Sequence, residues 1–391
     1  MERASLVSVH EHYGRAIKSS GKRFAASLPH PKHTYRIGSL LATVLAGSWR
    51  LSPQALQCSE TGLTEITPLL IGSMSGALAW RNVRNTNLKT SRAGLQLQEA
   101  HRIHAVRTLV REHAIKKVLR LLYRKGLEPI LVKGWAAASL YPESGLRPYG
   151  DIDLVVRPEQ HPAASGAIAM AIPANNLERE YYIDLHCGVE ALDDHSYSVL
   201  YSRSTIATLD DVDVRVFSPE DHLRILCVHL LRHNAFRPLW LCDIGAAVEN
   251  RGTNFDWDRC LGRNKRRADL VACAIGLAHV LLGAEVADTP VAQRAARLPR
   301  WLVADVLKQW ETPYSMSQAP VTHHAPMSKY LRDPRGLLID VRRRWPNPIE
   351  ATMYVDGPFN ELPRWPFQIG ECAIRAAKFV RQLPAALREG K

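Results

Sequence analysis

Two aspartates separated by one residue are the first candidates for chemistry in this chain. Asp151 and Asp153 flank Ile152 and lead into the apolar residues Leu154 to Val156. Side chains of a β-strand alternate between its faces, so both carboxylates would point to one side while Ile152 and Leu154 enter a core. Two adjacent carboxylates repel each other unless a cation lies between them. Because such oxygen ligands suit Mg²⁺ or Mn²⁺ together with substrate phosphates, the spacing predicts phosphoryl or nucleotidyl transfer.

The segment before this pair shows how it could be positioned. An apolar run from Ile130 to Val132 stops at Lys133 and Gly134, and an Ala-rich stretch and a Gly/Pro-rich turn then lead to Asp151. These residues predict a strand, a glycine turn, a short helix and a second strand that carries the acids.

This arrangement resembles the nucleotidyltransferase superfamily to which DNA polymerase beta belongs, and most closely its uncharacterised bacterial branch with the signature L-K-G…Y…G-L-R-P…D-I-D-L. The matching residues are Lys133, Gly134, Tyr141, Gly145, Leu146, Arg147, Pro148, Asp151, Ile152, Asp153 and Leu154. The resemblance covers about residues 127–245, with Val132 in place of the first Leu. It implies an α+β fold in which a small mixed β-sheet is flanked by N- and C-terminal helical regions. It also implies Mg²⁺-dependent transfer of a nucleoside monophosphate from a nucleoside triphosphate, such as ATP, to an acceptor.

The superfamily requires a third carboxylate on a neighbouring strand, and Asp184 can supply it. This residue interrupts the aromatic and β-branched run from Tyr181 to Leu185, which otherwise favours a strand. Glu180 is the alternative third acid. We predict that Asp151, Asp153 and Asp184 hold the metal ions, with Asp184 also placed to activate the acceptor hydroxyl.

The sequence departs from the superfamily at the phosphate-binding turn. Many members have Gly-Ser there, whereas Trp135 follows Gly134 in this chain and the next hydroxyl is that of Ser139. We expect Gly134, Ser139, Lys133 and Arg147 to contact the nucleotide, with the two cations binding its phosphates. The alternatives are that Lys133 is a solvent-facing strand end and that Arg147 is a turn residue paired with one of the aspartates.

A second D-x-D pattern, Asp211 and Asp213, is a rival metal pair. It follows Asp210 and precedes alternating valines, which predicts a hairpin turn entering a strand. Because no glycine turn lies upstream, we expect this pair to be inert.

The remaining chain divides by composition. We predict a basic tail over 1–33, a helical region over 34–126, the catalytic core over 127–217, a second helical region over 218–310, and a Pro-rich segment with a terminal helix over 311–391. The clearest helices are expected at Leu95–Lys125, at the segment after Ser218 and near Glu371–Leu383, with Ser218 as N-cap and Pro219 in the first helical position. The apolar positions expected to define the first of these helices are Ile103, Val106, Leu109, Val110, Ile115, Val118, Leu119 and Leu122.

Three histidines share one stripe of the helix after Ser218. His222, His229 and His233 are spaced by seven and four residues, and the H-x-x-x-H pair of His229 and His233 could ligate zinc, but no third ligand is evident. Hydrogen bonds of the histidines to backbone or to Asp243 are favoured. The resembling branch carries a histidine-bearing helix followed by W-x-x-D, here Trp240 to Asp243, so a substrate-side role for His229 or His233 stays open.

Charge and cysteine content set broad bounds. The chain of 391 residues carries 51 basic and 38 acidic residues, a net charge of +13, which favours phosphate-rich partners. Basic clusters at 263–267 and 342–344 are read as solvated faces, with nucleic-acid binding as the alternative. Seven scattered cysteines and no apolar run of membrane-spanning length predict a cytoplasmic protein without membrane contact.

Two other functions fit parts of this pattern. One is a catalytically silent scaffold that keeps the fold, supported by the missing Gly-Ser hydroxyl. The other is a nucleic-acid-binding protein driven by the net charge. The acceptor of the transferase could be a small molecule, a protein or an RNA.

Overall fold

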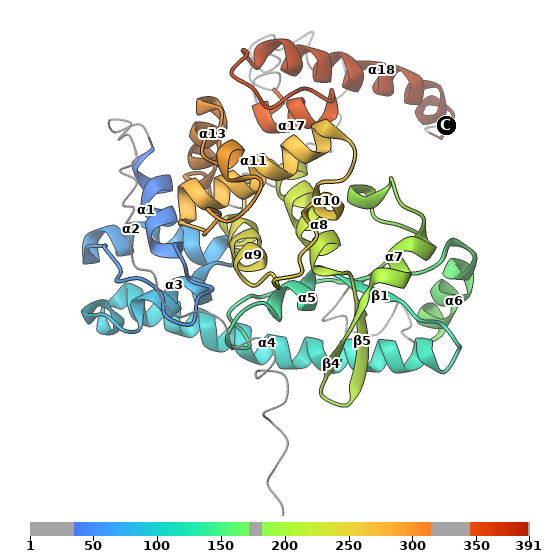
Figure 1. Ribbon diagram of the computed structural model, residues 1–391, viewed down its shortest axis with the longest axis horizontal. Coiled ribbons are helices and arrows are strands. Elements are labelled where there is room, and N and C mark those ends of the chain that lie inside the picture. Colours follow the sequence, from blue (N-terminus) through green and yellow to red (C-terminus); the bar gives the residue numbers. More distant parts are fainter. Residues whose placement is uncertain (1–34, 172–181, 314–344, 390–391) are drawn as a thin grey trace, which may run out of the picture.

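Five strands form one mixed sheet in the computed structural model, which describes residues 35–171, 182–313 and 345–389 (Figure 1). The strands are β1 Ile130–Val132, β2 Ile152–Val155, β3 Ile183–His186, β4 Thr205–Leu209 and β5 Val212–Val216. Their order in the sheet is β3-β2-β1-β5-β4. Strand β1 is antiparallel to β2 and parallel to β5, β2 is parallel to β3, and β4 and β5 form an antiparallel hairpin. The predicted small mixed sheet in an α+β fold is confirmed.

Along the sequence, helices precede the strands, lie between them and follow them. Those before and within the sheet region are α1 Arg36–Leu45, α2 Glu60–Gly72, α3 Gly76–Val83, α4 Arg92–Tyr123, α5 Gly134–Ala138, α6 His161–Ala171 and α7 Tyr197–Arg203, with 3-10 turns η1 Asn87–Thr90, η2 Pro158–Gln160 and η3 Glu190–Leu192. Those after the sheet are α8 Pro219–Arg232, α9 Pro238–Glu249, α10 Trp257–Leu261, α11 Lys265–Leu282, α12 Ala292–Ala295, α13 Arg300–Trp310, α17 Pro348–Tyr354 and α18 Trp365–Glu389.

The two faces of the sheet are covered by different helices. Leu131 and Leu154 pack against α4 and α6 in one buried cluster. Val132 and Val155 pack against α7 and α8 in another. Because neighbouring residues of a strand point to opposite faces, Asp153 shares the side of Val155 and faces the α7 and α8 layer.

Helix α4 runs along the other face of the sheet (Figure 1). It begins three residues before the predicted start because the Ser91 hydroxyl accepts a hydrogen bond from the Gly94 N–H. Only the second half of the predicted apolar stripe is a core face: Ile115, Val118, Leu119 and Leu122 are buried. The first half of the stripe lies at the surface, since Ile103, Val106, Leu109 and Val110 are each at least 40% exposed.

The N-terminal and C-terminal helical regions share one hydrophobic core. Buried residues of α1, α2 and α3 join those of α8, α9, α11 and α13 in a single cluster. The predicted start of α8 is confirmed, because Ser218 accepts a hydrogen bond from the Asp221 N–H and Pro219 is the first helical residue. The terminal helix α18 exists but is longer than predicted.

Some expectations lie outside the described residues: the tail over 1–33, Glu180 and the basic cluster at 342–344. All seven cysteines lie within the described residues and are free thiols. Among the helices that the structure describes, none has both the length and the apolar character of a membrane span.

Candidate active site

Asp153 and Asp184 lie side by side on adjacent strands. Strands β2 and β3 run parallel, and their register pairs Asp153 directly with Asp184. Opposed residues of paired strands point to the same face, so both carboxylates face the same side of the sheet. The predicted proximity of these two acids is therefore present in the structure.

His186 joins this pair, two residues beyond Asp184 and on the same face of β3. Its Nε2 atom lies 3.1 Å from Asp184 Oδ2 and 3.5 Å from Asp153 Oδ1. One ligand atom from each of these three side chains lies within 4.8 Å of the others, which is the spacing of a metal-binding group. His186 was not among the predicted metal ligands, although the same period-two alternation that links Asp151 to Asp153 links Asp184 to His186.

The neighbours of Asp153 lower its pKa. Burial by itself raises the pKa of Asp153, but the hydrogen bond with His186 and the positive charge of Lys133 outweigh it, so the pKa lies below its usual value. The same hydrogen bond with Asp153 raises the pKa of His186, against the effect of burial. His186 and Lys133 are thus the groups that favour the charged form of the Asp153 carboxylate.

The donor set fits a divalent metal ion. Two carboxylates on a rigid pair of strands are suitable ligands for Mg²⁺ or Mn²⁺, and an imidazole nitrogen favours Mn²⁺ over Mg²⁺. The side chains of Asp153, Asp184 and His186 are 14%, 45% and 37% exposed, so the group is partly accessible to solvent.

Lys133 lies at the end of β1, beside this group. Its Nζ is 3.4 Å from Asp153 Oδ1, so its side chain is directed at the acids and is not merely a solvent-facing strand end. Its backbone has a φ of 50°, an uncommon conformation for a residue with a side chain. Strained residues of this kind cluster at functional sites, where the surrounding structure holds them.

The other predicted residues occupy different positions. Asp151 precedes β2, is exposed and lies outside the three-residue group; its carbonyl oxygen is 3.5 Å from the place where a Cβ on Gly134 would stand. Gly134 itself has a φ of 34°, which explains the glycine at the turn. The Ser139 hydroxyl donates to the Ala136 carbonyl at 2.9 Å, a local bond within its own helical turn.

The structure does not place Arg147 as predicted, in contact with the phosphates of a nucleotide at the acidic group. Its guanidinium is buried and forms a forked ion pair with Asp243, with Nη2 2.7 Å and Nε 3.2 Å from Oδ2. The Tyr141 hydroxyl donates to the other oxygen of Asp243 at 2.8 Å. Arg147 is therefore paired with an aspartate, as the alternative interpretation had it, but with one on α9. The side chain holds α9 against the turn before β2 and is not directed at the acidic group.

The rival D-x-D pair lies in the β4–β5 hairpin, as expected. Asp210 has a φ of 53° at the turn, and Leu209 pairs with Val212. Asp211 forms an ion pair with Arg120 of α4, and Lys116 of α4 pairs with Asp210. These acids are thus partners of a basic helix, and no described metal-binding group includes them.

The histidines of α8 take up separate positions. His222 is buried beneath the surface, and burial lowers its pKa to about 4. His229 and His233 instead pack on Trp240, with ring centroids 4.5 Å and 5.3 Å from it. Among the described side chains, none of the three belongs to a metal-binding group, and the hydrogen bonds that Asp243 accepts come from Arg147 and Tyr141.

A mixed sheet that places two carboxylates and a histidine on adjacent strands beside a lysine is a site suited to metal-dependent chemistry on phosphates. The family described as an uncharacterised nucleotidyltransferase family has a sequence model that matches residues 73–283, more than half of the chain. The chain belongs to this family and is a nucleotidyltransferase. No curated protein and no solved structure matches it significantly.

Proposed function

We propose that this protein transfers a nucleoside monophosphate from a nucleoside triphosphate to an acceptor hydroxyl, with Mg²⁺ or Mn²⁺ as cofactor. The observation that supports this most is the pairing of Asp153 with Asp184 in register on two strands, with His186 at 3.5 Å or less from both carboxylates and Lys133 at 3.4 Å from Asp153. Family membership supports the reaction class.

The proposal gives each residue a role. Asp153 and Asp184 bind the metal together with His186 and with Asp151, the residue that precedes β2. A bound ion would neutralise the phosphate charge and orient the reacting oxygens. Lys133 and the backbone at Gly134 bind the phosphates, and Lys133 can leave Asp153 for the nucleotide once the metal neutralises that carboxylate.

The bonds that change are those at the α-phosphorus. The acceptor oxygen attacks this atom, its proton passes to Asp184, and the bond to the oxygen that bridges to the β-phosphate breaks, so that pyrophosphate leaves. Asp184 suits the proton-accepting role because it is the more exposed of the two paired carboxylates.

A transfer assay tests this proposal. The protein is incubated with each of the four α-labelled nucleoside triphosphates and Mg²⁺ or Mn²⁺, together with a cell extract as the source of acceptor. Label is expected in a small molecule, a protein or an RNA with the wild type and with Asp211→Asn/Asp213→Asn. It should fall at least 100-fold with Asp153→Asn/Asp184→Asn, because removing both ligands abolishes metal binding. Label that persists in this double variant would contradict the site assignment.

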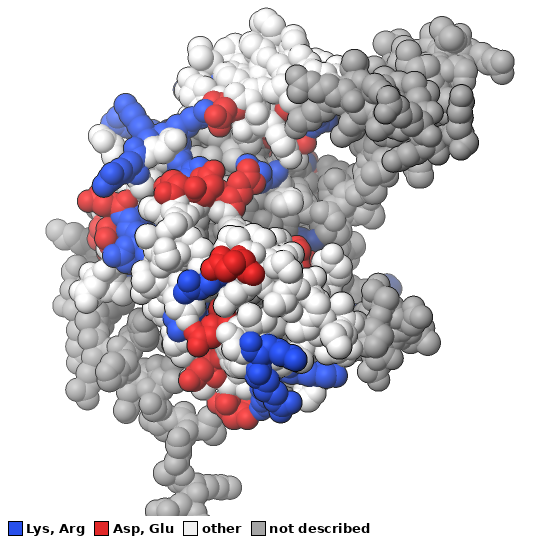
Figure 2. Space-filling view, turned by 90° about the vertical axis from the view of Figure 1, so that its right-hand side faces the viewer, with Lys and Arg blue, Asp and Glu red and all other residues white. Residues whose placement is uncertain are grey.

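The alternative functions predict other results. A silent scaffold would transfer no label under any condition. A nucleic-acid-binding protein would bind RNA or DNA with a steep salt dependence. On the described part of the face drawn in Figure 2, two groups of basic side chains are separated by acidic ones.

A further inference from the structure

Helix α4 carries a stripe of basic side chains near its C-terminal end. His113, Lys117, Arg120 and Arg124 are exposed and follow one another at intervals of four, three and four residues. Side chains at this spacing lie on one face of a helix, because residues three and four positions apart are neighbours on its surface. At a rise of about 1.5 Å per residue, the stripe extends over about 16 Å. Lys117, Arg120 and Arg124 therefore place permanent positive charges in a line along the helix.

A groove follows this stripe. The four basic side chains line it together with Val118, Leu121 and Ala171, and its volume is about 280 Å³. Ala171 is the last residue of α6, which packs beside α4, because Ala164 and Ile168 of α6 share a buried cluster with Val118. None of the residues that line this α4 groove is acidic. The α4 groove thus combines a basic edge with apolar side chains.

Two of the cations in the α4 groove have no acidic partner. Arg120 pairs with Asp211 of the β4–β5 hairpin. Among the described residues, none forms an ion pair or a hydrogen bond with the side chain of Lys117 or of Arg124. Arg124 is also four residues from Arg120, a spacing at which like charges destabilise a helix. An anion in the groove would relieve this repulsion.

The α4 groove is separate from the acidic site. Val118 belongs to the buried cluster of Leu131 and Leu154, on one face of the sheet. Asp153 shares the side of Val155, which packs on the opposite face. The reaction proposed for the acids therefore does not account for the cations of the groove.

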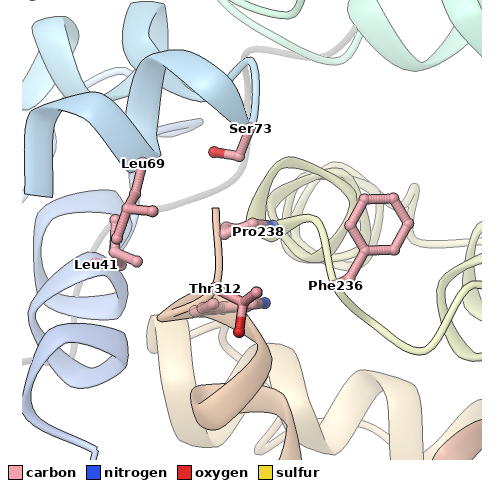
Figure 3. Close-up of a pocket in the computed structure, with 7 residues that line it drawn as sticks. Leu41, Leu69, Ser73, Phe236, Pro238 and Thr312 are labelled. Atoms are coloured by element: carbon pink, nitrogen blue, oxygen red, sulfur yellow. The ribbon is translucent and has the colours of Figure 1, made fainter. Parts of the chain in front are cut away.

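A second cavity offers no comparable chemistry. Leu41 and Leu69 stand on one side of it and Phe236 on the other, with Ser73 and Thr312 as polar lining residues (Figure 3). Its volume is about 10 Å³, which is room for about one water molecule. It has no charged lining residue.

We propose that the α4 groove binds a single strand of nucleic acid, with Lys117 and Arg124 on its phosphates and the apolar lining residues against its bases. A line of cations fits a phosphate backbone, which repeats its charge at regular intervals. The apolar lining favours a single strand, because unpaired bases present the apolar surface that a duplex stacks inside. The concave shape favours a strand over a lipid bilayer, whose flat surface would meet only the outer edge of the helix.

The test uses fluorescence anisotropy with labelled oligouridylate and oligodeoxyuridylate of equal length, over a series of salt concentrations and without divalent metal. The groove variant is Lys117→Ala/Arg124→Ala. The matched control is Arg92→Ala/Arg102→Ala, which removes two exposed arginines from the N-terminal half of α4 and changes the net charge equally.

The wild type should bind the single strands, and the groove variant should bind them about tenfold more weakly or less at low salt. The slope of log affinity against log salt concentration should be smaller by about 1.4 in the groove variant, because each phosphate contact of a single strand contributes about 0.7. The control should bind like the wild type. Binding of both probes would show that the groove accepts either sugar, and binding of oligouridylate alone would show that it also contacts the ribose 2′-hydroxyl.

Four results would overturn the inference. The wild type could bind neither probe, or the groove variant and the control could lose affinity equally, in which case net charge alone explains the binding. A duplex of the same length could compete as well as the single strand, so that the apolar lining is not used. Vesicles of phosphatidylserine and phosphatidylcholine could bind through Lys117 and Arg124 while the oligonucleotides do not, which would make this face a membrane contact.

The acidic variant separates this inference from the proposed function. Asp153→Asn/Asp184→Asn should bind the oligonucleotides like the wild type, because the groove lies on the other face of the sheet. A loss of binding in this variant would place the strand at the acids and contradict the inference. Wild-type protein that binds the strands but transfers no label would refute the proposed function alone.

Discussion

At Arg147, the guanidinium and the carboxylate of Asp243 form a buried ion pair that joins the turn before β2 to α9. Asp243 is fully buried and also accepts a hydrogen bond from Tyr141. Because Arg147, Tyr141 and Asp243 hold each other in place, their role is to position the site.

The first prediction concerns this ion pair. Arg147→Met should lower the free energy of unfolding by about 3–5 kcal/mol, because it leaves the Asp243 carboxylate buried without its cation. Urea unfolding measures this loss, and the double variant Arg147→Met/Asp243→Leu should be more stable than Arg147→Met alone. Wild-type stability of Arg147→Met together with weakened nucleotide binding would restore the phosphate role.

His222 leads to a pH prediction. Its buried imidazole has a pKa lowered from 6.5 to about 4, by burial first and then by the charge of Arg147, with Asp243 opposing. Above pH 6.5 the side chain is neutral in both the folded and the unfolded state. Below it, the unfolded state gains a proton that the folded state does not bind, so stability falls as the pH drops from 6.5 towards 4.

This fall can be measured by urea unfolding at a series of pH values. The contribution of His222 approaches about 1.4 kcal/mol per pH unit within that window. His222→Gln, which cannot titrate, should show a shallower decline than the wild type. His104, whose pKa is also lowered to about 4, should retain its own part of the slope in that variant. Equal slopes in the two proteins would contradict the prediction.

Among the elements, the turn between α5 and β2 depends on a close approach to α4. Gly145 has a φ of 83°, and a Cβ added there would lie 2.6 Å from Ala105 Cα. Gly150, later in the same turn, has no atom within 4 Å of the corresponding position. This turn carries the chain from Lys133 and Gly134 to Asp151 and Asp153, so its path positions β2.

The third prediction compares these two glycines. Gly145→Ala should destabilise the protein by about 1–3 kcal/mol or more, since it combines backbone strain with a clash against helix backbone. Gly150→Ala should change stability by less than about 1 kcal/mol. Thermal unfolding of both variants checks this, and equal unfolding temperatures would show that the approach to α4 is not required.

The elements also show what local sequence could predict. Strands β1 and β2 and the start of α8 were identifiable because an apolar run, a D-x-D alternation and a Ser-Pro cap are signals within a few residues. The Arg147–Asp243 ion pair joins residues 96 positions apart, and a motif does not specify which acid a cation meets. The helical period of α4 likewise did not specify which half of its apolar face is covered: periodicity marks a face, but tertiary packing decides whether anything covers it.

For the whole molecule, the arrangement of the helical regions has a consequence for unfolding. Helices from both ends of the sequence share one core, and α8 belongs both to that core and to a face of the sheet. The boundaries between separate regions at residues 126 and 217 stay a prediction made from the sequence.

The fourth prediction follows from this shared core. Unfolding in urea should be a single transition, with far-UV circular dichroism and tryptophan fluorescence giving the same midpoint, because the sheet cannot lose α8 without opening the helical core. Gly145→Ala should shift both signals together. Two separated transitions would mean that the sheet and the helices unfold independently.

The central claim is that Asp153 and Asp184 form the metal-dependent nucleotide site. Calorimetric titration of Mn²⁺ and a nucleoside triphosphate tests it most directly, without knowledge of the acceptor. Asp153→Asn/Asp184→Asn should lose metal-dependent nucleotide binding while keeping the wild-type circular dichroism, because the change removes ligands and their mutual repulsion together. Asp151→Asn/Asp153→Asn should lose this binding as well, and Asp211→Asn/Asp213→Asn should bind like the wild type. Unchanged nucleotide affinity in Asp153→Asn/Asp184→Asn, or a matching loss in the hairpin variant, would contradict the account.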